Sequence, residues 1–402
     1  MKNILIFNCG SSSQGFRVFR TGDENEPEVV ISGKARNVAT HTKAEPVLQW
    51  KYGGMQDEQR MCGLSSHRKA AEAILTLLKE KSIWVDAIGH RYVSGGKFFT
   101  QTARIDAETL AKLNKTLPLA PIHNPNSLSV IETCLETLPG IPEYVVFDTA
   151  FHADLPAESY TYAIPAELAE ENGFRKYGFH GLSYQYISRK TASMLGKPLQ
   201  DLKLILCHLG TGGSSITAMK DGRSLDTSMG YSPLQGLVMS TRCGDIDAEV
   251  VLELVRMGKT ADEIETILNN QSGLLGVSGF SSNLEEVITE AERGNTRCEL
   301  AFGVYAHRLQ QYLGAFTWLL NGADGIVFTD DVGLHSWKLR ERVCSHVEAL
   351  GIVLDKAANK KAVDGKPAFI HASTSQTKLM VIPTDEERVI LDEVLQNSQG
   401  MK

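Results

Sequence analysis

The sequence lacks the long apolar run that a membrane-spanning helix would need. No stretch of its 402 residues approaches the roughly 18 apolar residues of such a helix. At the start of the chain, a single lysine and a short apolar run, Ile4–Phe7, precede Asn8, which predicts a first strand and not a signal peptide. We therefore expect no membrane partner.

An excess of positive charge is also missing. The chain has 41 Lys and Arg against 48 Asp and Glu, a net charge of −7, and such a balance disfavours nucleic acid as a partner. Cysteine is sparse, and no Cys-x-x-Cys pair occurs. The 7 cysteines are Cys9, Cys62, Cys134, Cys207, Cys243, Cys298 and Cys344. An odd number of scattered cysteines is typical of reduced thiols in a cytoplasmic protein.

The chain does contain the same unusual sequence pattern twice. Residues 3–19 and residues 203–219 each read as an apolar run, a Gly/Ser/Thr loop and a second apolar run, which predicts a hairpin with a small-residue tip. A row of backbone N–H groups and hydroxyls at such a tip suits phosphate oxygens. Either loop alone is more often an ordinary hairpin. The pair, with one loop near the start of each half, indicates two similar lobes that each grip phosphate.

The surrounding pattern is that of an α/β protein, and its length allows two or three domains. Short runs of β-formers predict strands at 4–7, 16–19, 28–31, 87–90, 144–147, 203–208, 214–219, 223–225 and 325–329. Apolar residues at helical spacing predict helices at 66–81, 246–257, 261–269 and 297–320.

Four polar residues near these predicted strands and turns carry the candidate chemistry. Arg91 and Asp148 close predicted strands, and His180 and Arg242 lie in turns that contain glycine. Phosphoryl transfer needs cations and hydrogen-bond donors around the moving group, and arginine stays charged while its planar fork matches phosphate and carboxylate. Taken singly, each has a plainer interpretation. These are a surface ion pair for either arginine, a core histidine bonded to backbone for His180, and a helix N-cap for Asp148.

Segments spread in order along nearly the whole chain resemble the acetate kinase family. They are Asn8–Ser13, Gly89–Arg91, Ala120–Pro125, Phe147–His152, Tyr177–Gly181, His208–Gly212, Asp226–Gly230, Thr241–Asp247 and Ile382–Glu387. The resemblance implies the α/β fold of the acetate and sugar kinase/Hsc70/actin superfamily. That fold has two ribonuclease-H-like lobes, a duplicated actin-like ATPase-type domain, around a central cleft, usually in a homodimer. The lobes would be residues 1–150 with 383–402, and residues 151–382.

The resemblance also implies a reaction, the reversible phosphorylation of acetate to acetyl phosphate with Mg²⁺ or Mn²⁺. Arg91 and Arg242 would hold the carboxylate and the moving phosphoryl group, His180 would donate to that group, and Asp148 would orient the arginines or the metal water. Asn8 and Glu386 would help to place the metal. The phosphate-binding residues would be Ser11, Ser12, Ser13, His208, Gly210, Thr211, Gly212 and Gly213. The wall around the substrate methyl would be Val93, Ile122, Phe179 and Pro233. One extra methylene changes binding by only about 1–3 kcal/mol, so acetate and propionate both stay open.

The nucleoside end of the chain departs from the ATP-using members of that family. Those members have two glycines where this chain has Asp330 and Asp331, and an Asp and an Arg where it has Asn283 and Glu285. The altered set also includes Leu284, Val332 and His335. Glycines let a ribose and adenine lie against bare backbone, whereas carboxylates add bulk and negative charge.

This pattern resembles the small subgroup of acetate kinases that use pyrophosphate and phosphate in place of ATP and ADP. We therefore predict pyrophosphate as the donor, with an ATP-dependent acetate or propionate kinase as the alternative. Two other classes stay open at this point. One is a non-catalytic relative that binds phosphate or acyl phosphate, and the other is an actin-like filament protein. The full set of transfer residues argues against the first, and the substrate-pocket residues argue against the second.

Overall fold

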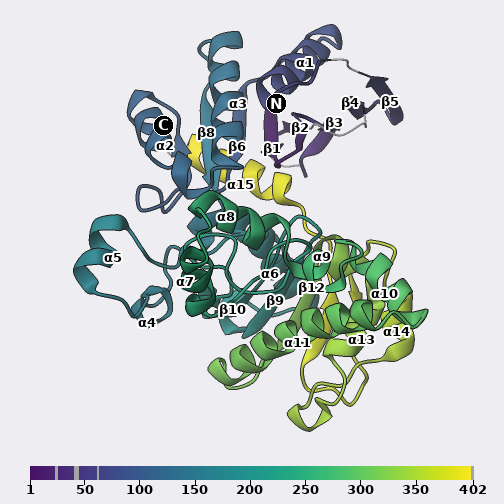
Figure 1. The fold of residues 1–402 in the computed structure, drawn as a ribbon. Coiled ribbons are helices and arrows are strands. Elements are labelled where there is room, and N and C mark those ends of the chain that lie inside the picture. The colour runs from purple at the N-terminus through teal and green to yellow at the C-terminus, as the bar shows by residue number, and fades with distance from the viewer. Residues whose placement is uncertain (23–25, 40–44, 61–62, 400–402) are drawn as a thin grey trace. The chain divides into compact units, whose positions relative to one another are not determined.

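The structure of the chain is a computed structural model that describes residues 1–22, 26–39, 45–60 and 63–399. The chain divides into two compact units (Figure 1). Unit 1 comprises Met1–Ala153 and Asp385–Lys402, and unit 2 comprises Asp154–Thr384. Each unit is α/β and has its own sheet, so the expected fold class with two lobes is confirmed.

The described residues of unit 1 form an eight-stranded sheet in the order β5-β4-β3-β2-β1-β6-β8-β7. Its strands are β1 (Lys2–Cys9), β2 (Ser13–Thr21), β3 (Glu28–Arg36), β4 (Val47–Tyr52), β5 (Met55–Arg60), β6 (Ala87–Tyr92), β7 (Ala103–Arg104) and β8 (Glu143–Phe147). Its helices are α1 (His67–Glu80), α2 (Ala107–Lys115), α3 (Asn124–Thr137) and α15 (Glu386–Gln399), with 3₁₀ turns at Leu117–Leu119 and Asp148–His152.

Two helices of unit 1 cover opposite faces of its sheet. Leu5 in β1 belongs to the core that α1 closes, whereas Ile6 lies with the α15 side chains Ile390 and Val394 around Gly89. Both faces of β1 are therefore buried, which explains why its sequence is a continuous apolar run rather than an alternating one. The strand β1 thus holds Asn8, which is partly buried, near its carboxyl end.

The described residues of unit 2 form a six-stranded sheet in the order β11-β10-β9-β12-β14-β13. Its strands are β9 (Leu204–Leu209), β10 (Ser214–Lys220), β11 (Arg223–Thr227), β12 (Gly325–Thr329), β13 (Ala368–Phe369) and β14 (Lys378–Val381). Its helices are α4 (Ala157–Tyr160), α5 (Ala166–Asn172), α6 (Gly181–Leu195), α7 (Ala248–Arg256), α8 (Ala261–Asn270), α9 (Gly273–Ser278), α10 (Leu284–Glu292), α11 (Thr296–Leu319), α12 (Asp330–His335), α13 (Trp337–Val343) and α14 (Lys356–Lys361), with 3₁₀ turns at Leu199–Asp201 and Glu348–Leu350.

Both predicted hairpins are present. β1 pairs antiparallel with β2, and β9 pairs antiparallel with β10. The two hairpins occupy corresponding places, because β1 also pairs parallel with β6 and β9 also pairs parallel with β12. One expectation was wrong in detail: β6 continues to Tyr92, so Arg91 lies inside the strand and does not follow its end.

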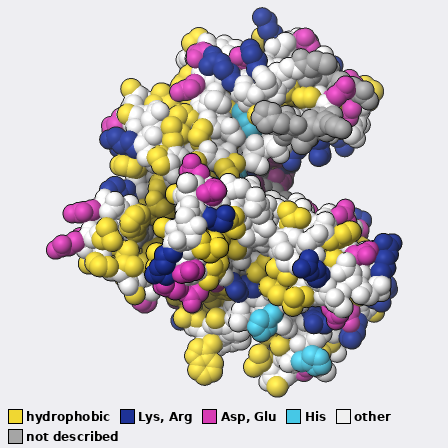
Figure 2. Space-filling view, in the orientation of Figure 1, with side chains coloured by type: hydrophobic (Ala, Val, Ile, Leu, Met, Phe, Trp, Pro, Cys, Tyr) yellow, Lys and Arg dark blue, Asp and Glu magenta, His cyan; other side chains and the backbone are white. Residues whose placement is uncertain are grey.

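The surface and the cysteines agree with the composition. Figure 2 shows acidic and basic side chains interspersed over the face in view. The described cysteines are all free thiols, and Cys62 lies outside the described residues. In the part of the chain that the structure describes, no helix has both the length and the apolar composition that crossing a membrane requires.

Candidate functional site

Three strands bring polar residues of unit 1 to the same edge of the sheet. β1, β6 and β8 run parallel side by side, so their carboxyl ends meet at one edge. Asn8 lies near the end of β1, Arg91 near the end of β6, and Asp148 directly after β8. Glu386, the first residue of α15, completes a group that we call the unit 1 cluster, which consists of Asn8, Arg91, Asp148 and Glu386.

Arg91 lies at the centre of the unit 1 cluster. Its Nη2 donates to Asp148 Oδ2 at 2.6 Å and its Nε donates to both carboxylate oxygens at 3.2 Å. Its Nη1 donates to Asn8 Oδ1 at 3.0 Å and lies 3.4 Å from Glu386 Oε2. Burial alone would lower the pKa of the Arg91 guanidinium, but the Asp148 and Glu386 carboxylates outweigh burial and raise it. Arg91 is therefore held rigidly in its charged form, and a surface ion pair is excluded.

Asn8 and Glu386 offer oxygen atoms that fit a small divalent cation. Asn8 Nδ2 donates to Glu386 Oε2 at 3.0 Å, and the Glu386 side chain is only 12% exposed. Mg²⁺ in enzymes that transfer phosphoryl groups typically takes one or two carboxylates, several waters and substrate phosphate oxygens. The start of α15 is fixed because Asp385 Oδ1 accepts from Arg388 N at 3.2 Å, and this fixes Glu386 beside Asn8.

The first loop, residues 10–12, is closed by its own backbone. Gly10 N donates to Ser13 O at 2.8 Å, and Val38 N donates to Ser12 O at 3.0 Å. The predicted phosphate binders Ser11 and Ser12 are exposed and Ser13 is partly buried. Exposed hydroxyls at a hairpin tip can reach a ligand, which is consistent with the predicted role.

His67 in α1 was not predicted as a site residue, yet it supports the first loop. Its Nε2 lies 2.9 Å from Gly10 O, and its side chain is almost fully buried. Burial lowers the pKa of His67 below its ordinary value of 6.5, against an opposing contribution from the Gly10 carbonyl. No local signal could have identified it, because 57 residues separate the two partners.

His180 in unit 2 is held by side chains. It precedes α6 with a left-handed backbone, φ 59°, and its Nδ1 lies 2.7 Å from Ser215 Oγ in β10. Ser215 Oγ also bonds the Tyr184 hydroxyl. The His180 ring stacks on His208 with the ring centroids 4.0 Å apart. A core histidine bonded only to backbone, the plainer interpretation, is therefore wrong for His180.

Arg242 is the opposite of Arg91, because it has no carboxylate partner among the described residues. Its Nη1 donates to Pro233 O at 3.3 Å and lies 3.8 Å from Met239 Sδ. Burial lowers the pKa of the guanidinium. A Cβ placed on Gly213 would lie 3.1 Å from Arg242 Nη1 and 3.7 Å from His180 Cε1. The second loop therefore lies against both candidate catalytic side chains of unit 2.

The second loop, residues 210–213, is engaged by two carboxylates. Thr211 donates to Asp331 twice, from its amide at 2.9 Å and from its hydroxyl at 2.7 Å. His208 Nε2 lies 3.1 Å from Asp330 Oδ2. A Cβ on Gly210 would lie 2.1 Å from Asp330 Oδ2, so any side chain at this position would displace the Asp330 carboxylate. The two donors of Thr211 that were expected to face phosphate thus bond a carboxylate.

The remaining residues predicted for the nucleoside pocket have structural partners. Asn283 caps α10, since its Oδ1 accepts from Glu285 N at 2.9 Å and from Glu286 N at 3.1 Å. Leu284 is buried in the core of unit 2, and Val332 packs against that core. His335 Nδ1 lies 2.9 Å from Val363 O. Of this set, Asp330 and Asp331 are the residues whose side chains contact a phosphate loop, and Glu285 is exposed.

The four residues expected around the substrate methyl are divided between the units. Val93 and Ile122 belong to unit 1, and Phe179 and Pro233 belong to unit 2. Val93 and Phe179 are buried, and Ile122 is 50% exposed. Pro233 adjoins the catalytic candidates directly, because its carbonyl accepts from Arg242.

Another group of possible metal ligands lies in the interior of unit 1. A ring nitrogen of His90, the Cys134 sulfur and a Glu143 oxygen lie within 4.8 Å of one another. His90 Nε2 and Glu143 Oε2 are 2.7 Å apart, a hydrogen-bond distance. Two ligands at about 2.0–2.1 Å from a tetrahedral zinc ion would be roughly 3.3 Å apart. The arrangement is therefore that of a buried hydrogen-bonded pair.

Comparison with known proteins places these features in a family. The Acetokinase family model matches residues 3–392. An acetate kinase of Dictyoglomus turgidum is 42% identical over 400 residues, covering 98% of this chain and 96% of the relative. The solved structure of the Entamoeba histolytica acetate kinase superposes with a TM-score of 0.88 at 39% identity, covering 98% and 99% of the two chains. A propionate kinase of Francisella tularensis superposes with the same TM-score at 35% identity and the same coverage.

The names of these relatives also bear on which phosphoryl donor the protein uses. They are the ordinary names of acetate and propionate kinases, and none of them mentions pyrophosphate. The comparisons therefore favour the alternative of an ATP-dependent kinase over the predicted pyrophosphate donor. They also support an enzyme that phosphorylates a carboxylate over a filament protein. With a family model that spans almost the whole sequence and relatives at about 40% identity, the chain belongs to the acetokinase family.

Proposed function

We propose that this protein interconverts acetate and acetyl phosphate by direct phosphoryl transfer. The observation that supports this most strongly is Arg242, a partly buried guanidinium without a carboxylate partner among the described residues. A buried charge is costly unless an opposite charge balances it. Because Arg242 adjoins His180 and the second loop, the missing anion would be a ligand, and a phosphoryl group with a carboxylate supplies it.

In the proposed reaction an acetate oxygen attacks the terminal phosphorus of the donor. The new P–O bond forms as the bond to the leaving phosphate breaks, and charge accumulates on the three equatorial oxygens. Arg242 and Arg91 would balance that charge, and His180, held by Ser215, would donate a hydrogen bond to the group. Asp148 would keep Arg91 in the orientation that its three hydrogen bonds now define.

We propose Mg²⁺ as the metal, held through Asn8 Oδ1 and the Glu386 carboxylate. When bound, the ion would neutralise charge on the donor phosphates and align them for transfer. Formally, the unit 1 cluster carries one arginine against two carboxylates, so a divalent cation offsets its negative charge. Acetate is the proposed acceptor, and propionate stays the alternative. A homodimer and a cytoplasmic location stay predictions.

For the phosphoryl donor, the comparisons support ATP, and one observation favours a second candidate. Asp331 accepts both donors of Thr211, and Asp330 lies beside His208. A nucleotide that approached this loop would meet two carboxylates in place of bare glycine backbone. A ribose or adenine at this place would have to displace the Asp331 carboxylate from its two Thr211 donors, and polar groups that lose their partners cost on the order of a few kcal/mol, whereas pyrophosphate needs no nucleoside pocket. Pyrophosphate is therefore the donor that the residues of the second loop favour.

A donor comparison decides between the two candidates. The wild-type protein is given acetate and Mg²⁺ with either ATP or pyrophosphate, and kcat/KM is measured for each donor. A higher value with pyrophosphate supports the second candidate, and a higher value with ATP refutes it. If neither donor yields acetyl phosphate with folded protein, the non-catalytic alternative is favoured instead.

Two variants test whether Asp330 and Asp331 determine which donor the protein uses. The Asp330→Gly/Asp331→Gly double variant removes both bulk and charge, and the Asp330→Asn/Asp331→Asn variant removes the charge alone. If the carboxylates exclude ATP, kcat/KM for ATP rises in both variants, by a larger factor in the glycine variant. If the ratio of kcat/KM for ATP to kcat/KM for pyrophosphate is unchanged in both variants, these residues do not select the donor.

A further inference from the structure

The sheet of unit 1 carries a polar face beside the first turn of α15. Strand register places residues on a common face when they are paired across antiparallel strands. Gly15 pairs with Lys34, Arg17 with Ser32, Ser32 with Lys51, Lys34 with Gln49, and Lys51 with Gln56. All of these residues except Gly15 are polar. The alternate residues of the same strands, such as Val18, Ile31 and Leu48, form the core with α1.

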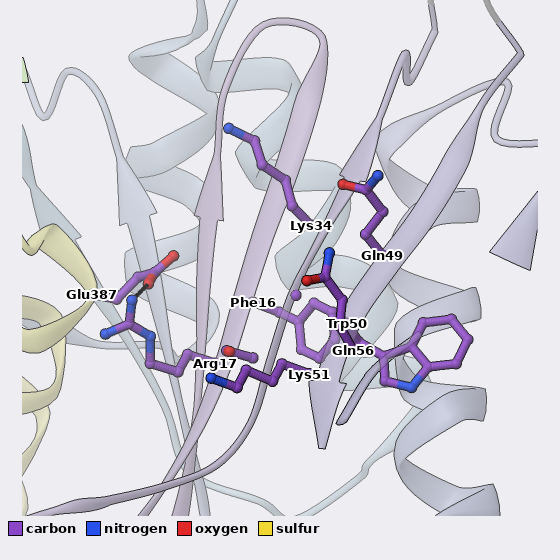
Figure 3. A pocket seen from close by; sticks show the side chains of 10 residues that line it. Phe16, Arg17, Lys34, Gln49, Trp50, Lys51, Gln56 and Glu387 are labelled. Carbon is purple, nitrogen blue, oxygen red and sulfur yellow. Dashed lines mark ion pairs between the residues drawn. The ribbon is translucent and has the colours of Figure 1, made fainter. Parts of the chain in front are cut away.

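This face contains a hollow, which we call the lysine hollow. Its volume is about 290 Å³, near the lower end of the size of small-molecule pockets, and Arg17, Lys34, Gln49, Trp50, Lys51 and Glu387 are among its lining residues. Figure 3 shows Lys34 and Lys51 reaching toward opposite ends of the hollow, with the Gln56 amide between them. The hollow therefore presents cationic groups at both ends and a polar group in the middle.

The two lysines form no close ion pair with a described carboxylate, although burial raises the pKa of the Glu387 carboxyl and the charge of Lys34 acts to lower it. Among the described residues, neither the Lys34 nor the Lys51 ammonium group forms an ion pair, and the Gln56 amide forms no hydrogen bond. The nearby carboxylates are already engaged, because Arg17 pairs with Asp385 at 3.0 Å and with Glu387 at 2.6 Å. Gln49 is also engaged, since it accepts from Arg36 at 2.9 Å and donates to Glu58 at 2.6 Å. The open groups of the hollow are thus two cations and one amide.

We propose that the lysine hollow binds a small elongated anion with a phosphate group at each end. Ammonium groups at both ends match two phosphates, and the Gln56 amide matches the hydroxyl groups of the carbon skeleton between them. The two ammonium groups point apart in Figure 3, so a single phosphate would contact one of them in this conformation. The volume limits the ligand to a metabolite of roughly the size of a sugar bisphosphate.

The lining of the lysine hollow includes no residue of either candidate phosphate loop, but it includes a residue of the helix that carries Glu386. Glu387, which lines the hollow, follows Glu386 in the first turn of α15, and Arg17 holds Glu387 in place. An anion in the hollow would lie close to Arg17 and compete with Glu387 for its charge. The site is therefore placed to influence the position of the proposed metal ligand Glu386.

Fluorine NMR of protein labelled with fluorotryptophan tests the proposal directly. The chain has 4 tryptophans. Trp50 is among the lining residues, but it is only 8% exposed and packs in the core beneath the hollow, so it reports on the hollow through packing. Trp84 and Trp318 are 76% and 89% exposed and serve as internal controls. Substitution Trp50→Phe assigns the Trp50 resonance. Titration with fructose bisphosphate, at constant ionic strength, is expected to shift that resonance saturably, and fructose monophosphate is expected to bind about tenfold more weakly, since one exposed charge contact is lost.

Variants distinguish a built site from general attraction by positive charge. Lys34→Gln/Lys51→Gln is expected to weaken binding of the bisphosphate by about tenfold or more. Its matched control, Lys79→Gln/Lys197→Gln, removes two exposed lysines from other surfaces and is expected to bind as the wild type does. The proposal is overturned if the Trp50 resonance does not respond, or if both double variants bind equally well. Because the readout is binding, it is independent of whether the protein transfers phosphate.

Discussion

Removing Arg91 should damage both stability and activity, and the two losses can be separated. Its guanidinium makes three hydrogen bonds to Asp148, and the two side chains are only 15% and 1% exposed. Removing one partner of a buried ion pair typically costs about 3–5 kcal/mol, because it leaves the other charge in a poorly solvated place. Arg91→Ala should therefore lower the free energy of unfolding by roughly 3 kcal/mol, near the lower limit because some water reaches Arg91.

The loss of stability caused by Arg91→Ala should depend on the presence of Asp148. If the loss arises from the Asp148 carboxylate left without its arginine, Arg91→Ala/Asp148→Ala should be clearly less destabilised than the sum of the single variants. Urea unfolding of the wild type and the three variants measures this coupling. Arg256→Ala, which removes an exposed arginine that pairs with Glu249 on the surface, should leave the unfolding midpoint unchanged.

Turnover provides the second part of the same prediction. Loss of an arginine that faces a phosphoryl transition state lowers kcat by roughly 10³-fold or more, so Arg91→Ala and the double variant should both be nearly inactive under conditions in which they are folded. Additive stability losses would refute the account of a buried pair. A folded Arg91→Ala protein with near-normal turnover would remove Arg91 from the proposed centre.

Three further predictions concern other parts of the site. Arg242→Met should lower turnover by roughly 10³-fold without lowering the free energy of unfolding, since it removes a partly buried charge that no described carboxylate balances; a large loss of stability in urea would contradict this. Gly213→Ala should lower kcat by about 10-fold to 100-fold, because its methyl displaces Arg242, and unchanged steady-state kinetics would refute that contact. The pKa of His67 is lowered in the folded protein, so its contribution to stability is present above pH 6.5 and is lost as the pH falls through the folded-state pKa. The thermal unfolding temperature of His67→Gln should therefore depend less on pH below 6.5 than that of the wild type. An identical pH dependence would show that His67 does not titrate in this range.

The sequence predicted the parts of the fold that have a local signal. The two Gly/Ser/Thr hairpins and the buried strand β8 follow from short apolar runs bounded by small or polar residues. The hairpin of β4 and β5 also had a signal that was missed: Gly53 and Gly54 form its two-residue loop, both with positive φ, and such a loop between β-formers is a hairpin signature.

The contacts within the site could not be predicted in the same way, because they join residues far apart in the chain. Asp148 and Arg91 were identified separately, but only the parallel pairing of β6 with β8 brings them together. The departure at Asp331 was noted from the family resemblance. That its carboxylate bonds the Thr211 amide, 120 residues earlier, became visible only in three dimensions.

The central claim is that this chain makes acetyl phosphate. The most direct test incubates the purified protein with acetate, Mg²⁺ and either ATP or pyrophosphate, and traps the product as its hydroxamate. The account predicts product that depends on acetate and on at least one of the two donors, and that falls by roughly 10³-fold in Arg242→Met. Folded wild-type protein that forms no acyl phosphate with either donor would contradict the account.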